Sequence, residues 1–204
     1  MNPPYRKPPV FLDRDGTLIV EKHFLHDPDQ VQMEIGVVEG LTSLQQAGHP
    51  LIVISNQSGI GRGALTEADA YRVNTKVSEL LSKEGIKILA WYLCPHAPDA
   101  ACSCRKPAPG MPIAASAEWG VQLAGSYVIG DKQSDLETAD AIGGTGILIT
   151  TGHGREHRAW AQAHGRPTFA RLTEAAQYIR TCESGNDESD AAERNTQAHE
   201  RGKQ

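Results

Sequence analysis

The chain has 204 residues, and its 20 basic and 25 acidic side chains give a formal net charge of −5. Its length fits one domain, its 39% apolar content is enough for one mainly aliphatic core, and its charge gives no reason to expect nucleic acid as a partner. No apolar run approaches the ~20 residues that span a bilayer and no apolar segment follows Arg6 and Lys7, so we expect no membrane partner, no signal peptide and a place in the cytoplasm. A monomer is the default expectation.

The first predicted strand, residues 10–12, leads directly into two aspartates. Asp13 and Asp15 lie two positions apart at the strand's exit, so their carboxylates can converge on one small volume. Gly16 then lets the backbone turn sharply beside whatever they hold. Such a pair suits the binding of a hard cation and attack on a phosphorus atom. The simpler interpretation is an aspartate-rich turn that closes a strand.

Apolar runs typical of buried strands alternate along the chain with segments of helical periodicity. Strands are predicted at residues 10–12, 51–54, 86–93, 127–130 and 146–150. Helices are predicted at residues 37–47, 67–83, 108–120 and 134–142. Residues 21–36 are predicted to be irregular, and the glycine-rich residues 59–63 to form a flexible loop. This alternation favours an α/β fold with a parallel sheet covered on both faces.

The C-terminal segment differs in composition from the rest of the chain. Residues 181–204 contain no Leu, Ile, Val, Phe, Tyr or Trp, so they cannot bury enough surface to offset the chain entropy lost on ordering. We therefore predict one domain over residues 1–180 and a disordered polar tail over residues 181–204. The alternative is that the tail extends the final helix or binds a partner.

Three further polar segments follow predicted strands or precede a predicted helix. They are Ser55-Asn56, Arg105-Lys106 and Asp131-Lys132, with Asp135 four residues after Asp131. Each segment alone is weak evidence for a phosphate site, because Ser55-Asn56 also fits an ordinary turn and Lys106 a solvated surface cation. Together with the first pair of aspartates they fit a four-part phosphate site, since α/β sheets bind ligands at the ends of their parallel strands.

The order of these segments resembles the haloacid-dehalogenase-like phosphatase superfamily, whose motifs are Asp-x-Asp, a Ser or Thr, a Lys or Arg, and a late acidic cluster. The resemblance implies a three-layer, Rossmann-like fold, and the lack of a large insert implies that there is no large cap domain. It implies Asp13 as the nucleophile that forms an aspartyl-phosphate, and Asp15 as the general acid and base. Ser55 and Lys106 would then hold the transferring phosphoryl group.

The resemblance also implies a magnesium ion. Aspartate is ionised at pH 7 and needs no base to attack phosphorus, but it repels the phosphate dianion. A Mg²⁺ held by Asp13, Asp131 and the carbonyl of Asp15 would remove that repulsion. The role of Asp135 stays open between orienting Lys132, orienting a water on the metal, and capping the following helix.

Four soft metal ligands fall within eleven positions, at Cys94, His96, Cys102 and Cys104. A Cys3His set is a known structural zinc site, and a metal would order a segment that has no core of its own. A disulfide is a poor alternative in the cytoplasm. We therefore predict a zinc-binding loop over residues 94–104, which would also fix the position of Lys106.

Two phosphatase families of this superfamily combine the four motifs with such a zinc loop, one acting on heptose 1,7-bisphosphate and the other on histidinol phosphate. Residues 56–63 resemble the heptose family, which keeps Ser-Gly-Ile and an Arg, whereas the histidinol family has Asp-Gly-Leu there. Residues 21–24 match the sugar-contacting segment of the heptose family but carry His23-Phe24 in place of its usual Gly-Tyr. The substrate contacts implied for a phosphorylated sugar are Glu21, Lys22, His23, Phe24, Asn56, Gln57, Ser58, Arg62, Arg105 and Lys132.

Two alternatives are kept beside this hypothesis of a phosphoric monoester hydrolase. One is a histidinol-phosphate phosphatase with the same chemistry. The other is a non-catalytic zinc-binding interaction module that keeps a relic of the phosphatase fold. The presence of all the motif residues favours an enzyme, with Mg²⁺ as its catalytic and Zn²⁺ as its structural metal.

Overall fold

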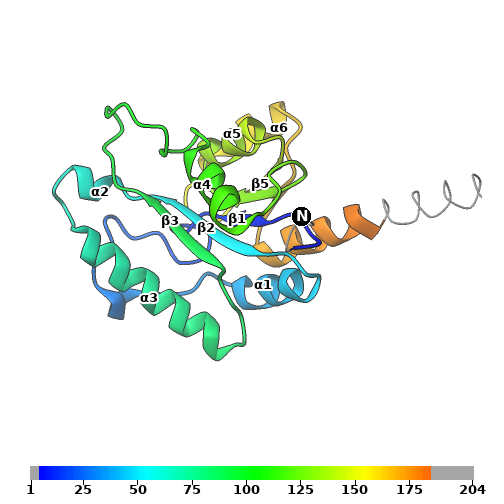
Figure 1. Cartoon of the computed structure of the whole chain (residues 1–204), viewed down its shortest axis with the longest axis horizontal. Helices are drawn as coiled ribbons and strands as arrows, with labels where there is room; N and C mark the ends of the chain where they lie inside the picture. Colours follow the sequence, from blue (N-terminus) through cyan, green and yellow to red (C-terminus); the bar gives the residue numbers. More distant parts are fainter. Residues whose placement is uncertain (1–4, 185–204) are drawn as a thin grey trace, which may run out of the picture.

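A computed structural model describes residues 5–184 and shows a three-layer α/β fold (Figure 1). The described residues form one six-stranded, all-parallel sheet in the order β3-β2-β1-β4-β5-β6. Its strands are β1 (Val10–Leu12), β2 (Leu51–Asn56), β3 (Ala90–Cys94), β4 (Tyr127–Gly130), β5 (Thr145–Ile149) and β6 (Thr168–Phe169). The predicted parallel sheet is therefore confirmed.

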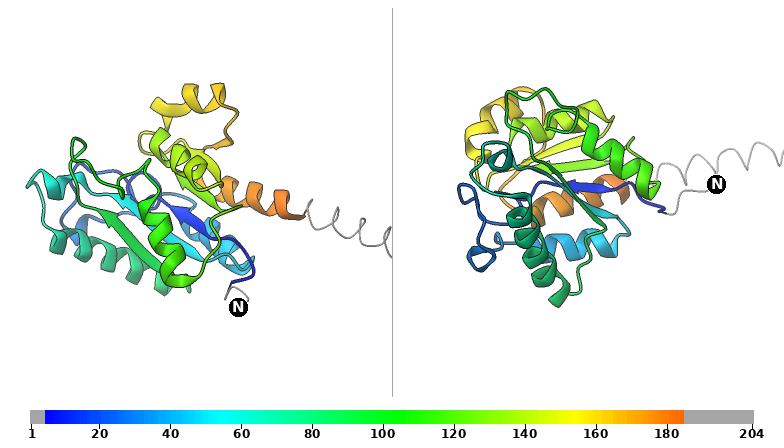
Figure 2. Two further views of the ribbon diagram at one scale, coloured as in Figure 1. Left: turned by 45° about the horizontal axis from the view of Figure 1, so that its top comes forward. Right: turned by 60° about the vertical axis from the view of Figure 1, so that its left-hand side comes forward.

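Helices cover both faces of the sheet, as Figure 2 shows. The elements between the strands are the 3-10 turn η1 (Pro28–Gln30), α1 (Val37–Gln46), α2 (Ser58–Gly61), α3 (Glu67–Lys83), α4 (Gly110–Trp119), α5 (Gln133–Ala141) and α6 (Gly154–Ala163). A last helix covers residues 172–184 as far as the structure describes it. Helices α1, α3 and the last helix share one apolar cluster with the sheet, and α4, α5 and α6 pack on its opposite face.

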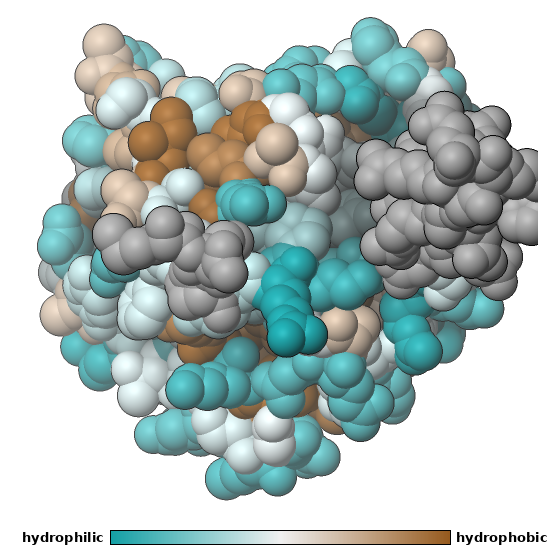
Figure 3. Space-filling view, turned by 45° about the vertical axis from the view of Figure 1, so that its right-hand side comes forward, coloured by the Kyte–Doolittle hydropathy of each residue, from teal (hydrophilic) through white to brown (hydrophobic). Residues whose placement is uncertain are grey.

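The strand residues divide between the two faces by the two-residue period of a β-strand. In β1, Val10 and Leu12 join the cluster of α1 and α3, whereas Phe11 joins the cluster of α4 and α5. In β2, Val53 and Ile54 divide in the same way. Because both faces are covered, these strands appear in the sequence as continuous apolar runs. On the face drawn in Figure 3, hydrophilic side chains accordingly leave only separate apolar patches.

The predicted flexible loop at residues 59–63 is wrong in part, because residues 58–61 form the short helix α2. Two backbone bonds tie this turn to the chain after β3: Gln57 N donates to the carbonyl of Cys94 at 2.8 Å, and Gly61 N to that of Pro95 at 2.8 Å. A Cβ on Gly61 would lie 2.6 Å from the backbone nitrogen of Ala97, so only glycine permits this approach.

Other boundaries differ from the predictions at the ends of elements. Strand β3 begins at Ala90 rather than at residue 86, because Ile86 N still bonds the carbonyl of Leu81 at the end of α3. Helix α3 begins as predicted, with Thr66 and Asp69 forming a reciprocal capping box. The sequence analysis did not predict helix α6 or the two-residue β6.

The last helix includes residues 181–184, which the sequence analysis assigned to the tail. Here the Glu183 carboxylate accepts from Lys7 at 3.0 Å and lies 3.2 Å from the buried ring of His49, so this helix contacts the segment before β1. The remainder of the predicted tail lies outside the described residues. No helix within residues 5–184 is long and apolar enough to cross a membrane.

The sheet topology brings the polar segments of the sequence to one edge. Strands β2, β1 and β4 are neighbours and all run in the same direction, so Asp13 and Asp131, which follow β1 and β4, lie at the same edge as Ser55, which is the last residue but one of β2 before its end at Asn56. The chain reaches β2 on one side of β1 and β4 on the other, which makes this edge a topological switch point. Crevices at such points are the usual ligand sites of open α/β sheets.

Candidate active site

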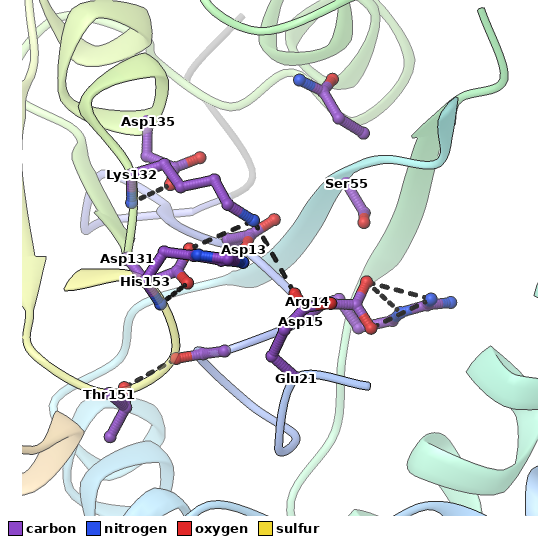
Figure 4. Close-up of polar contacts among 12 residues, drawn as sticks. Asp13, Arg14, Asp15, Glu21, Ser55, Asp131, Lys132, Asp135, Thr151 and His153 are labelled. Carbon is purple, nitrogen blue, oxygen red and sulfur yellow. Dashed lines mark hydrogen bonds and ion pairs between the residues drawn. The ribbon is translucent and has the colours of Figure 1, made fainter. Parts of the chain in front are cut away.

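Three buried carboxylates form the floor of the crevice. Asp13, Asp131 and Asp135 are 5%, 0% and 1% exposed, and each offers an oxygen within 4.8 Å of the others. Asp13 is fixed by the sheet, because its N–H donates to the carbonyl of Ile129 at 3.0 Å and so extends the pairing of β1 with β4. In Figure 4 the side chains of Asp13 and Asp131 lie next to each other.

Asp131 is held by one oxygen and leaves the other free. Its Oδ2 accepts from the backbone N–H of His153 at 2.8 Å, whereas its buried Oδ1 has no hydrogen-bond partner and only a long ion-pair contact, 3.8 Å from Nζ of Lys132 (Figure 4). A Cβ on Gly16 or on Gly152 would lie 2.3 Å from that Oδ2, so two glycines let their loops close around the carboxylate. Burial, and then the charge of Asp13, raise the pKa of Asp131 to about 8.

These features match what a hard cation requires. An orphaned oxygen, buried beside a second carboxylate, is unfavourable unless a cation or a donor meets it. Carboxylate and carbonyl oxygens are also the ligands that Mg²⁺ prefers. Asp13 and Asp131, with the backbone of Asp15 two residues away, therefore fit the predicted magnesium site.

Lys106 is the cation of the floor. Its Nζ lies 2.6 Å from Oδ1 of Asp13, 2.6 Å from Oδ1 of Asp135 and 2.9 Å from the carbonyl oxygen of Ile54. Burial opposes its charge, but the carboxylates of Asp13 and Asp135 outweigh that cost and raise the pKa of Lys106. This geometry places a permanent positive charge beside Asp13, where a transferring phosphoryl group would carry negative charge.

Asp135 both caps a helix and pairs with a lysine. Its Oδ2 accepts from the N–H of Lys132 at 2.9 Å, which caps the start of α5. Its Oδ1 meets Lys106, a contact that the sequence analysis did not consider. Of the three roles left open for Asp135, the helix cap is the one that the contacts include.

Asn56 and Gln57 were predicted to contact substrate, and both also make internal contacts. The Asn56 amide brackets the backbone of Lys106, accepting from its N–H at 3.0 Å and donating to its carbonyl at 3.1 Å. Gln57 donates to Oδ2 of Asp15 at 2.7 Å and to Oγ of Ser55 at 2.8 Å. Both side chains therefore hold neighbouring motif residues in place, although both also line the cavity.

A cavity of about 270 Å³ opens above this floor. It is lined by predicted site residues from four separate parts of the sequence, namely Asp13, Asp15, Glu21, Lys22, His23, Phe24, Ser55, Asn56, Gln57, Ser58, Arg62, Lys106 and Lys132. It is also lined by Asp135, whose role the sequence left open, and by residues that were not predicted, namely Arg14, Leu25, Gly59, Ser134 and His153. Asp131 and Arg105 are not part of this lining; the guanidinium of Arg105 donates to the carbonyl of His96 at 3.3 Å.

The wall formed by residues 21–24 carries charge and strain. Burial, and then the charge of Asp15, raise the pKa of Glu21, while Lys132 at 3.8 Å opposes the shift. Phe24 has a φ of 51°, an uncommon conformation for a bulky residue, and a Cβ on Gly59 would lie 2.7 Å from its ring. Lys22 donates its Nζ to the carbonyl of Gln30 at 2.6 Å. The wall is therefore held from both ends.

The four soft ligands converge beside the site. Sγ of Cys94 lies 3.2 Å from Sγ of Cys104, 3.8 Å from Sγ of Cys102 and 3.4 Å from Nδ1 of His96. A tetrahedron of zinc bonds of ~2.3 Å has edges of ~3.8 Å, close to these separations. Burial, and then the Cys104 thiol, raise the pKa of Cys94 to about 12, so a bound cation would be needed to keep it a thiolate. The cluster thus fits a closed Cys3His metal site.

Comparison with known proteins places this geometry in a family. Residues 103–175 match the HAD-hydrolase-like family model. The chain is 38% identical over 153 residues, 71% of its length and 81% of the relative's, to the D-glycero-beta-D-manno-heptose-1,7-bisphosphate 7-phosphatase of Yersinia pestis. The enzyme of the same name from Escherichia coli K12 is 37% identical over the same share of this chain and 80% of its own length. The chain belongs to this family of HAD phosphatases.

Solved structures of the family have the same fold. The D,D-heptose 1,7-bisphosphate phosphatase of B. bronchiseptica, solved with magnesium and phosphate, superimposes with a TM-score of 0.79 at 31% identity and covers 86% of this chain and 99% of its own. The corresponding structure from Burkholderia thailandensis has a TM-score of 0.63 at 28% identity and covers 85% and 98%. The histidinol-phosphate and non-catalytic alternatives are therefore not favoured.

Sequence reasoning missed Arg14 and His153 in this phosphatase. Arg14 lies between the two aspartates of the first motif, but a charged residue beside a motif usually faces solvent, whereas this one is 1% exposed. His153 was not among the predicted site residues, and its backbone N–H supports Asp131 while the residue also lines the cavity. The available signal in the sequence was the glycine before it. Gly152 adopts a φ of 48°, a left-handed conformation that favours glycine and marks a tight turn before the helix.

Proposed function

We propose that this phosphatase removes the 7-phosphate from D-glycero-β-D-manno-heptose 1,7-bisphosphate. The observation that carries the proposal is the meeting of Asp13, Lys106 and Asp131 on the floor of a cavity, in a chain 37–38% identical to relatives with that activity. The preference for the β-anomer is taken from the names of those relatives. We expect the enzyme to act as a monomer in the cytoplasm.

The chemistry proceeds in two displacements on phosphorus. Oδ of Asp13 attacks the 7-phosphorus, the bond to the sugar oxygen breaks, and Asp15 donates a proton to that leaving oxygen. Asp15 then takes a proton from water, the water oxygen attacks the aspartyl-phosphate, and inorganic phosphate leaves. Lys106 stabilises the charge on the phosphoryl oxygens in both steps, and the Ser55 hydroxyl, on the neighbouring strand, donates to one of them.

Two metals complete the proposal. Asp13, Asp131 and the carbonyl of Asp15 would hold a Mg²⁺, which supplies electrostatic shielding between carboxylate and phosphate when bound. The solved relative from B. bronchiseptica contains magnesium and phosphate, which supports this assignment. Cys94, His96, Cys102 and Cys104 would hold a structural Zn²⁺, and the loop that they close leads directly to Lys106.

The exposed cations around the cavity would bind the remainder of the substrate. Arg62 lines the cavity on α2, and Lys132 lines it at the start of α5. Arg105 precedes Lys106 on the zinc loop and lies outside the lining, at the carbonyl of His96. We assign Arg62 and Arg105 to the second phosphate and Glu21, His23 and Phe24 to the sugar.

The test is the position of cleavage. The purified enzyme with Mg²⁺ is incubated with the β-anomer of heptose 1,7-bisphosphate, and the products are followed by ³¹P NMR. The proposal predicts that the 7-phosphate signal is replaced by inorganic phosphate while the anomeric phosphate signal persists. Loss of the anomeric phosphate, or no hydrolysis at saturating substrate and Mg²⁺, would reject it.

A further inference from the structure

Arg14 is the most deeply placed cation near the site, and none of the steps above uses it. It lies between Asp13 and Asp15 in the sequence, and it is 1% exposed, among the largest fully buried side chains of the chain. Burying a guanidinium is costly unless partners meet its donors. The partners that it has therefore indicate what it does.

The guanidinium of Arg14 grips both oxygens of the Asp15 carboxylate. Its Nε donates to Oδ2 at 3.0 Å and its Nη2 to Oδ1 at 3.2 Å, which is the paired, planar geometry that arginine makes with carboxylates (Figure 4). Two parallel bonds fix the rotation of the carboxylate about its own axis, whereas a single bond would leave it free. Lysine, with a single charged nitrogen, cannot reproduce this fork.

The remaining Nη1 of Arg14 is anchored on the opposite side. It donates at 2.8 Å to Oδ1 of Asn74, a residue of α3 that is only 7% exposed. Asn74 is thus a polar group on the buried face of α3, and its carbonyl oxygen is satisfied by Arg14. The helix therefore fixes the guanidinium, and the guanidinium fixes the carboxylate.

Gln57, in the turn between β2 and α2, completes the support of Asp15. Its amide donates to Oδ2 of Asp15 at 2.7 Å and to the Ser55 hydroxyl at 2.8 Å. The same amide therefore links the proposed general acid, Asp15, to Ser55, the proposed hydrogen-bond donor to the phosphoryl group. The Asp15 side chain is 15% exposed and lines the cavity. Its carboxylate is thus restrained from behind while it remains accessible to a ligand in the cavity.

We propose that Arg14 is a positioning residue, which fixes the Asp15 carboxylate toward the leaving oxygen and is itself aligned by Asn74. This inference rests on the proposed acid–base role of Asp15. A proton passes from Asp15 to the sugar oxygen as the phosphorus–oxygen bond breaks. A tilt of the carboxyl group would increase the distance between its oxygen and the sugar oxygen and so slow this proton transfer. Arg14 acts only through Asp15 and touches no reacting atom.

A double-mutant cycle tests the inference, with Arg14→Met, Asp15→Asn and the double variant measured on p-nitrophenyl phosphate and on the heptose bisphosphate. Arg14→Met should lower kcat by about 10- to 100-fold with KM nearly unchanged, because only the orientation of the acid changes. The double variant should be no more than about twofold slower than Asp15→Asn, since the two residues act as one unit. Fully multiplicative losses would overturn the proposal, because a residue that only supports the fold loses activity independently of Asp15.

Conservative and control variants separate the fork from the charge. Arg14→Lys keeps the charge without the fork and should recover less than about a tenth of the lost kcat. Asn74→Ala frees the guanidinium on one side and should lower kcat less than Arg14→Met. Arg72→Met removes an exposed arginine of α3, the helix that carries Asn74, and should leave kcat and KM unchanged. Full recovery by Arg14→Lys would overturn the proposal.

A crystal structure of Arg14→Met gives a test that needs no turnover. The Asp15 carboxylate should rotate away from its orientation in the wild-type protein, whereas an unchanged carboxylate held by Gln57 alone would overturn the inference. If the wild-type enzyme does not hydrolyse heptose bisphosphate, the proposed substrate fails, but the structural test and the cycle on p-nitrophenyl phosphate still decide the role of Arg14.

Discussion

The floor and the rim of the active site are built differently. The floor consists of Asp13, Lys106, Asp131 and Asp135, all nearly inaccessible, and within it Lys106 pairs with Asp13 and Asp135. The side chains of Lys106 and Asp135 are 2% and 1% exposed. The rim consists of residues 21–24, Arg62, Lys132 and His153, and there the side chains of Lys132 and His153 are 37% and 42% exposed. Buried charged groups held in fixed positions suit catalysis. Exposed groups on loops suit substrate recognition, because loops can vary without disturbing the fold.

This difference predicts which substitutions abolish the reaction and which only redirect it. Removing one partner of a buried ion pair costs much free energy, because the other charge is left buried and unpaired. Exposed cations are screened by water and contribute less. Changes in the floor should therefore act on kcat, and changes in the rim on KM and on the choice of substrate.

The largest effect is expected for Asp13→Asn. The neutral amide cannot attack phosphorus, so kcat should fall on the order of 10³-fold or more, while zinc content and melting temperature stay near those of the wild type. Steady-state rates, metal analysis and a thermal scan measure these quantities. If the variant retained more than a few per cent of the wild-type rate, Asp13 would not be the nucleophile.

An intermediate effect is expected for Cys102→Ser, which touches the floor only indirectly. The loss of one ligand should release the metal, and kcat should fall about 10- to 100-fold because the loop no longer fixes Lys106. Mass spectrometry of the native protein should find one zinc per chain in the wild type and none in the variant. Cys182→Ser, in the last helix, is the control and should keep both zinc and activity. Full activity in a zinc-free wild type would contradict the zinc loop.

The smallest effects are expected at the rim. Arg62→Ala should raise the KM for heptose 1,7-bisphosphate about tenfold and change the KM for a heptose monophosphate less than about twofold, because only the bisphosphate has a second charge to lose. Arg105→Ala should act in the same direction but more weakly, since its guanidinium bonds the carbonyl of His96 and does not line the cavity. Equal increases in KM for the bisphosphate and the monophosphate would show that these arginines do not bind the second phosphate.

The floor was predictable in part from sequence, because two of its residues follow buried strands. Asp13 and Asp131 lie directly after apolar runs, and the pairing of β1 with β4 brings them together whatever the loops do. The pairing of Asp135 with Lys106 was not predictable, because it joins a helix cap to a loop 29 positions earlier in a contact that the sequence does not mark. The grip of Arg14 on Asp15 was missed for a related reason: the sequence does not show which charged neighbour of a motif is buried.

The rim was predictable as a set but not in its contacts. Residues 21–24 and Arg62 do line the cavity, as their resemblance to the family implied. Gln57 instead supports Asp15, and Arg105 bonds the zinc loop, because side-chain direction depends on local backbone geometry. The folding of residues 58–61 into α2 depends on contacts with the chain after β3, so local propensity alone predicted a loop.

The specificity ratio between two phosphate esters tests the central claim most directly. Purified enzyme with saturating Mg²⁺ is assayed for phosphate release from heptose 1,7-bisphosphate and from histidinol phosphate, and kcat/KM is determined for each. We predict a ratio of at least about 100 in favour of the bisphosphate, because the floor would serve both esters, whereas the role proposed for the rim is to bind a second phosphate and a sugar. A ratio near one, or a preference for histidinol phosphate, would contradict the assignment of substrate choice to this rim.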